Sequence, residues 1–145
     1  MFVGAVARAA WLGGAVRKGS IDVVAIMQPQ QKSQVVMMAH NNGFTVERDE
    51  VDASEELDLV PMMFEGVRVH VLVASNALYA RMVRDAWEER IGDHDWRVPS
   101  REDLALLLAL GEDDDALREM VALPDFDRDR YNEKLISIGL RGLVV

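Results

Sequence analysis

The stretch Gly13-Gly14-Ala15-Val16-Arg17-Lys18-Gly19-Ser20-Ile21-Asp22-Val23-Val24-Ala25-Ile26-Met27 decides the fold of this chain. Its glycines predict the end of a helix and a tight turn, and the apolar, β-branched run after them is typical of a central strand buried on both faces. A single carboxylate, that of Asp22, falls near the start of the strand. The order helix, glycine turn and strand therefore predicts an α/β arrangement in which the turn is exposed at one edge of the sheet.

The turn is also a candidate phosphate site. Glycines let backbone N–H groups approach an anion, so Gly19 and Ser20 could donate to a phosphate while Arg17 and Lys18 neutralise it. Asp22, just beyond, could hold a divalent metal against that phosphate. The alternative is a plain helix-to-strand turn in which the Asp22 carboxylate is solvated or caps a neighbouring element.

Charge is distributed unevenly along the 145 residues. The whole chain has 16 basic and 25 acidic residues, a formal balance of −9, which makes general affinity for nucleic acid unlikely. Residues 1–48 hold five basic and two acidic residues, a balance of +3, and the remainder is −12. An anionic ligand is therefore expected at the N-terminal third.

Composition excludes several kinds of site. With no cysteine, the chain has no disulfide, thiol nucleophile or thiolate metal site. Residues 1–16 are apolar, but they lack a basic leading segment and Arg8 interrupts them, so a secretory signal is not expected. No run approaches the roughly 20 apolar residues of a membrane span. We expect a cytoplasmic protein with no membrane partner.

Patterning along the chain predicts one α/β or α+β domain, residues 1–145, with a small mixed β-sheet flanked by helices. Residues 1–98 would contain the sheet, and residues 99–145 would form a helical C-terminal part. Helices are expected at residues 2–12, 30–42, 75–90, 100–110, 114–123 and 127–138. Strands are expected at residues 21–27, 44–48, 59–64 and 67–74, with a strand or extended link at 96–99.

Two local signals support these expectations. Glu65-Gly66 between two β-branched or apolar runs predicts a hairpin, and the segment from Ser100 to Asp103 is close to a helix-capping box. In the helix expected at 75–90, the pairs Arg81–Asp85 and Arg84–Glu88 would lie at i,i+4 on the solvent side.

The same residues resemble a known family. Gly19-Ser20-Ile21-Asp22-Val23-Val24 resembles the Gly-Ser-x-Asp-x-Asp signature of the nucleotidyltransferase superfamily, which has the DNA-polymerase-β-like fold. The closer similarity is to bacterial nucleotidyltransferase-like proteins that include abortive-infection toxins. In those proteins an early Gly-Gly-x-Ala segment occurs, and Gly4-Ala5-Val6-Ala7 resembles a worn version of it. Ser100-Arg101-Glu102-Asp103-Leu104 resembles their later Ser-Pro-Glu-Asp-Leu segment and falls at the same place in the order of motifs. The resemblance covers nearly the whole chain.

The resemblance implies transfer of a nucleotidyl group from a nucleoside triphosphate, with metal ions held by three carboxylates. Asp22 matches the first carboxylate, but Val24 takes the place of the second and His70 the place of the third. Leu108 stands where the family often has a lysine, and Ala116-Leu117-Arg118-Glu119 stands for an Asp-Leu-x-Asp segment. These departures predict a domain that kept the fold and lost the reaction.

Two hypotheses on function follow. In the first, the chain is a non-catalytic module that binds a nucleotide or a protein partner, or serves as a structural dimer. In the second, it is an active nucleotidyltransferase, toxin-like, that uses Mg²⁺ or Mn²⁺ to transfer a nucleotide to a protein, an RNA or a small molecule. Val24 and His70 favour the first, because neither completes an oxygen-rich site for a hard cation.

Three further histidine or acidic features have simpler explanations. His70 is expected to be a half-buried, hydrogen-bonded strand residue, although Asp22 and His70 with Glu65 or Glu47 could hold a softer ion such as Zn²⁺. Residues 93–95, Asp-His-Asp, are expected to form a polar turn rather than an acid–base site. Residues 112–115 are expected to open a helix, where negative charge is favourable.

Overall fold

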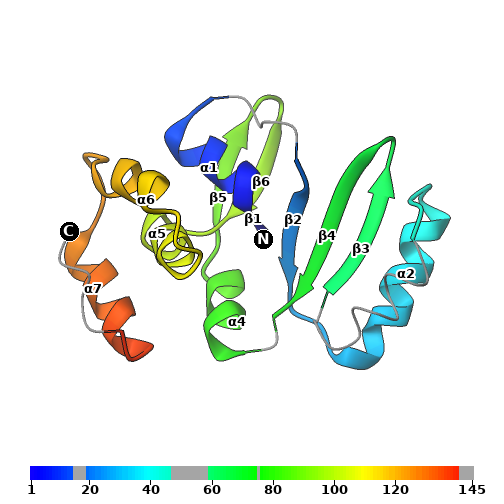
Figure 1. Ribbon diagram of the computed structural model, residues 1–145. Coiled ribbons are helices and arrows are strands. Elements are labelled where there is room, and N and C mark those ends of the chain that lie inside the picture. Colours follow the sequence, from blue (N-terminus) through cyan, green and yellow to red (C-terminus); the bar gives the residue numbers. More distant parts are fainter. Residues whose placement is uncertain (15–18, 47–58, 75, 141–145) are drawn as a thin grey trace.

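The computed structural model describes residues 1–14, 19–46, 59–74 and 76–140, and within them the chain is a mixed α/β fold, as predicted (Figure 1). Its strands are β1 (Phe2–Val3), β2 (Ile21–Ala25), β3 (Leu59–Phe64), β4 (Val67–Val73), β5 (Trp87–Ile91) and β6 (His94–Val98). Its helices are α1 (Gly4–Leu12), the short 3₁₀ turn η1 (Pro29–Gln31), α2 (Lys32–Asn41), α4 (Ala77–Arg84), α5 (Arg101–Leu110), α6 (Asp114–Val121) and α7 (Arg128–Ser137).

Four strands form a mixed sheet in the order β1-β2-β4-β3. β2 is central and runs parallel to β4, while β1 and β3 are antiparallel to their neighbours. The predicted hairpin joins β3 to β4, and its turn residues Glu65 and Gly66 both have positive φ, 48° and 80°. A two-residue turn with positive φ matches the right-handed twist of the two strands. This explains why Glu-Gly stands between the two apolar runs.

The helix predicted at 75–90 is shorter than expected. α4 ends at Arg84, and residues 87–91 instead form β5, which pairs with β6 in a separate two-stranded sheet. The prediction of an i,i+4 pair between Arg84 and Glu88 is therefore wrong, because Glu88 is in a strand. The apolar spacing predicts a helix through residue 90. Residues 87–91 instead pair with β6, which follows directly after the two-residue turn Gly92-Asp93, and this hairpin pairing overrides the helical preference.

Three other boundaries differ from the prediction. Phe2–Val3 pairs with β2 before the first helix begins. Of the strand expected at 44–48, Thr45 alone pairs with Met63 among the described residues, and residues 47 and 48 lie outside them. Asp93 follows Gly92 in the β5–β6 turn, whereas His94 and Asp95 already belong to β6.

Two apolar cores hold these elements together. α2 packs on one face of the four-stranded sheet through Ala39, Val60 and Met62. A larger core joins α5, α6 and α7 to α1, α4 and β6, because Ala7, Met82 and Val98 are buried with the C-terminal helices. The helical part therefore packs directly against the N-terminal helix. The division into residues 1–98 and 99–145 stays a prediction.

The predicted cap at Ser100 forms, and it extends into a buried network. The Asp103 N–H donates to Ser100 Oγ over 3.1 Å, and the Ser100 hydroxyl donates to Asp103 Oδ2 over 2.9 Å. Lys134 on α7 pairs with the other oxygen of Asp103, whose side chain is 1% exposed. This charge pair joins α5 to α7 inside the helical core.

Replacing Lys134 by methionine tests that network. We expect Lys134→Met to lower the free energy of unfolding by about 3–5 kcal/mol, because Asp103 would be left charged and buried without its partner. Urea unfolding measures the loss. The matched control is Arg118→Ala, which breaks an ion pair whose two side chains are 69% and 92% exposed, and should change stability by less than about 1 kcal/mol. Equal effects of the two substitutions would contradict a structural role for the buried pair.

Candidate functional site

The parallel pairing of β2 with β4 brings together the two residues that the sequence singled out. Asp22 is opposite His70 in the strand register, so both side chains project from the same face of the sheet. Nδ1 of His70 lies 2.9 Å from Oδ1 of Asp22, which is a hydrogen bond or, with a protonated ring, an ion pair. The two side chains are 29% and 27% exposed, so a ligand can still reach them.

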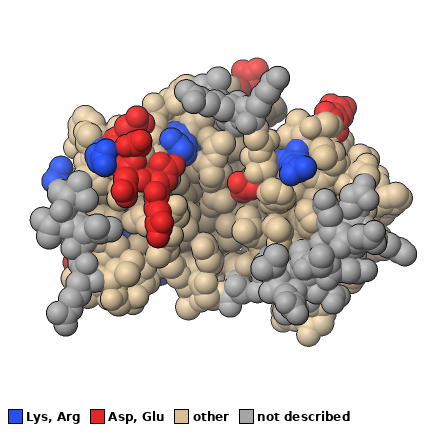
Figure 2. Space-filling view, in the orientation of Figure 1, with Lys and Arg blue, Asp and Glu red and all other residues tan. Residues whose placement is uncertain are grey.

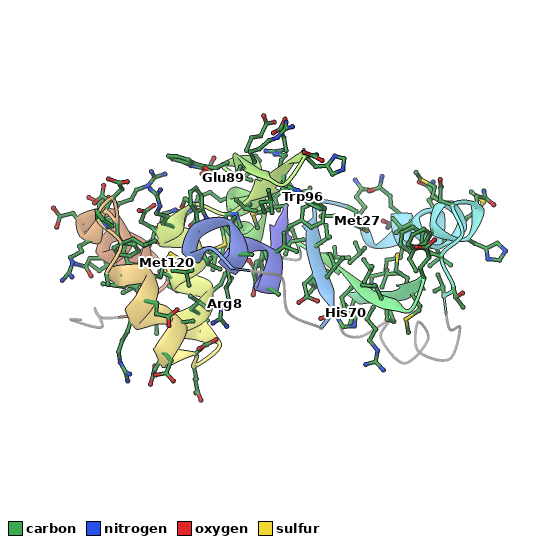
Figure 3. The ribbon with its side chains drawn as sticks, turned by 90° about the horizontal axis from the view of Figure 1, so that it is seen from above. Arg8, Met27, His70, Glu89, Trp96 and Met120 are labelled. Carbon is green, nitrogen blue, oxygen red and sulfur yellow. The ribbon has the colours of Figure 1, made fainter. Side chains whose placement is uncertain are left out.

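His70 projects from the face of the sheet that α2 does not cover. In the view of Figure 3, α2 lies on one side of β3 and β4, and His70 points to the other. Figure 2 looks onto that face, where charged side chains gather over the region of α6 and are sparse over the sheet. Part of this charge is acidic, because α6 begins with Asp113, Asp114 and Asp115.

Gly4 completes the surroundings of Asp22. It is the first residue of α1, has φ of +58°, and lies so close to Asp22 that a Cβ built on it would be 2.9 Å from Oδ2. One carboxylate oxygen thus contacts His70 and the other faces the first turn of α1, whose partial positive charge favours an anion. The sequence carried a signal for this contact, since a glycine opens an otherwise alanine-rich helix, but its partner is 18 residues away.

Val24 occupies the remaining position beside Asp22. Val24 lies two residues after Asp22 on β2 and therefore shares its face, yet it is only 3% exposed and its cross-strand neighbour is Leu72. Its backbone is fixed as well, because its N–H donates to the carbonyl oxygen of Met1 over 2.8 Å. The floor of the site beyond Asp22 is therefore apolar.

The other residues that the sequence predicts for the site are not part of the Asp22–His70 pair. Gly19 is exposed and Ser20 half-buried immediately before β2, and Arg17, Lys18 and Glu47 lie outside the described residues. Glu65 is exposed at the β3–β4 turn, five positions along the chain from His70. The strand pairing of β2 with β4 therefore brings Asp22 and His70 together, whereas Glu65 lies in the turn outside this pairing.

This arrangement supplies few ligands for a metal. Across the described ranges, no group of three or more histidine and acidic side chains is gathered in a way that could hold a metal ion. Asp22 and His70 are one oxygen and one nitrogen ligand already bonded to each other, whereas Mg²⁺ prefers an octahedral set of oxygens. Within the described ranges, the second imidazole nitrogen and the other carboxylate oxygen have no hydrogen-bond partner, so this pair could contact a polar ligand.

Comparisons with known proteins do not assign the chain to a family. No protein-family model matches the chain, and no curated protein matches it in sequence. In the described part of the chain, no helix has the length and apolar character needed to cross a membrane.

Substituting Gly4 tests how tightly Asp22 is held. We expect Gly4→Ala to lower the free energy of unfolding by about 1–2 kcal/mol from the left-handed backbone alone, and more from the approach of its Cβ to the Asp22 carboxylate. Chemical denaturation of Gly4→Ala, Asp22→Ala and the double variant separates the two contributions. If the cost of Gly4→Ala is the same with and without the Asp22 side chain, the close approach is not a source of constraint.

Proposed function

We propose that this chain is a nucleotidyltransferase-like module that binds its ligand without catalysing metal-dependent transfer. The observation that carries the proposal is the side chain bonded to Asp22: a histidine occupies the place of one expected carboxylate, and a buried valine occupies the place of another. Two-metal transfer requires carboxylates that bridge and orient both ions, and one carboxylate with one imidazole does not provide them.

The ligand best supported by the sequence is a nucleoside triphosphate. The first 48 residues have a balance of +3 in a chain of −9, and the glycine turn leads directly into the strand that carries Asp22. Backbone N–H groups of Gly19 and Ser20 and the side chains of Arg17 and Lys18 are the groups proposed to bind its phosphates. A protein partner is the other occupant consistent with a site that binds without reacting.

An assay of pyrophosphate release tests the loss of catalysis. The chain is incubated with each of the four ribonucleoside triphosphates and Mg²⁺ or Mn²⁺, alone and with protein or RNA acceptors. We expect no release above the blank, and the same result for Asp22→Ala. Turnover that Asp22→Ala abolishes would instead identify an active nucleotidyltransferase, with its remaining metal ligands supplied by other groups.

A thermal-shift titration tests nucleotide binding separately. At ten times the dissociation constant, a ligand that binds only the folded state stabilises it by about 1.4 kcal/mol, which for a chain of this size raises Tm by about 3–6 °C. We expect that rise with triphosphate and its loss in Arg17→Ala, while Arg118→Ala, an exposed arginine of α6, keeps it. A triphosphate that leaves Tm unchanged at millimolar concentration excludes nucleotide as the ligand and leaves the protein partner.

A further inference from the structure

A cavity lies between α4 and α7, separate from the Asp22–His70 site. Its volume is about 340 Å³, and it is lined by Arg81, Asp85, Arg130, Glu133, Lys134 and Ser137. Asp22 is the second residue of β2, whereas the helix that forms one wall of this cavity follows the far end of β4 in the chain (Figure 1). None of the lining residues contributes to the site proposed above.

The guanidinium of Arg81 is the unusual group in this cavity wall. Its Nε and Nη2 atoms are shielded from water and have no hydrogen-bond partner among the residues that the structure describes. The sequence predicted an exposed i,i+4 pair with Asp85, and that prediction is wrong for Arg81, because two of its three nitrogens are buried and the Asp85 carboxylate does not bond to them. A buried donor without an acceptor is unfavourable, and more so when it is charged.

The two unpartnered atoms form one recognition edge. Nε–H and one N–H of Nη2 lie in the guanidinium plane and point in the same direction. An edge of this kind can donate to two oxygens of a carboxylate or phosphate at once. The other cations in the wall differ in availability. Lys134 is already paired with Asp103, while Arg130 is exposed at the rim.

We propose that the cavity between α4 and α7 is a binding site for a phosphate group, held in bidentate fashion by Arg81 and neutralised by Arg130. Two guanidinium groups match the double charge of a phosphate monoester better than the single charge of a carboxylate. Because both nitrogens are shielded in the structure, binding requires the flexible Arg81 side chain to turn this edge toward the cavity when the anion enters. Asp85 and Glu133, both exposed, also line the cavity, and their negative charges weaken binding of an anion.

The proposal has a consequence that a purely structural arginine would not have. If Arg81 awaits an anion, the anion-free protein contains two buried donors without acceptors on a charged group, and Arg81→Met should leave its stability unchanged or raise it. Phosphate should then raise the Tm of the natural chain and not that of Arg81→Met. A structural Arg81 would give the opposite result, a loss of stability in every buffer.

The experiment measures Tm in phosphate-free buffer and after addition of tens of millimolar inorganic phosphate, with chloride matched in ionic strength. We expect phosphate to raise Tm in the natural chain and in the control Arg118→Met, to raise it less in Arg130→Gln, and to leave Arg81→Met unchanged. Arg17→Ala should keep the response, which separates this cavity from the proposed triphosphate site. An equal rise in Arg81→Met, or no rise beyond chloride in the natural chain, overturns the proposal.

A spectroscopic titration provides the second readout, and it does not depend on how any variant folds. The ¹⁵N-labelled chain is titrated with inorganic phosphate and, separately, with acetate, and the Nε–H signal of Arg81 is followed. We expect a saturable shift with phosphate and a weaker one with acetate. A signal that does not move with phosphate, or that moves equally with acetate, contradicts the assignment of the cavity to a phosphate group.

Discussion

The parallel pairing of β2 with β4 is the constraint on which the proposed site depends. It sets Asp22 against His70 in register and leaves Val24 against Leu72, so one strand offset determines which side chains share the open face of the sheet. A shift of β2 by one residue against β4 would turn Asp22 to the sheet face that packs on α2, away from His70, where apolar side chains are buried. The hydrophobic core of that face therefore fixes the hydrogen bond on the other.

The surroundings of Asp22 follow from the same sheet. β1 pairs with β2 so that Val3 lies opposite Asp22, and α1 therefore begins beside the carboxylate, at a glycine whose φ is +58°. A side chain at that position would meet the carboxylate, so glycine is required both by backbone conformation and by space. Asp22 is held between a helix terminus and an imidazole, and among the described residues it does not belong to a group of three carboxylates such as two-metal transfer uses.

The sequence predicted those parts of the fold that are encoded locally. The β3–β4 hairpin, the strand that carries Asp22 and the cap at Ser100 each depend on residues within a few positions of one another, and all three are present. The inward position of Arg81 depends on α7, which is far along the chain, and it contradicts the solvent side predicted for the helix at residues 75–90. The β5 strand depends on a near neighbour, because it pairs with β6 across the turn Gly92-Asp93, and the helical periodicity predicted for residues 75–90 hides this hairpin. Strand pairing overrides helical periodicity here although the partner strand is adjacent in the chain. For the site, the sequence named Asp22 and His70, but it could not show that they bond to each other or that Gly4 closes on them.

A titration with Mn²⁺ tests the central claim, that Asp22 is bonded to His70 and does not hold a catalytic metal. The paramagnetic ion broadens the NMR signals of the residues around its site, so the signals of Asp22, His70 and Gly4 are followed in the natural chain and in the double variant Val24→Asp, His70→Asp, which restores three carboxylates. The account predicts no saturable broadening at Asp22 in the natural chain and its appearance in the double variant. Saturable broadening centred on Asp22 in the natural chain, removed by Asp22→Ala, would contradict it.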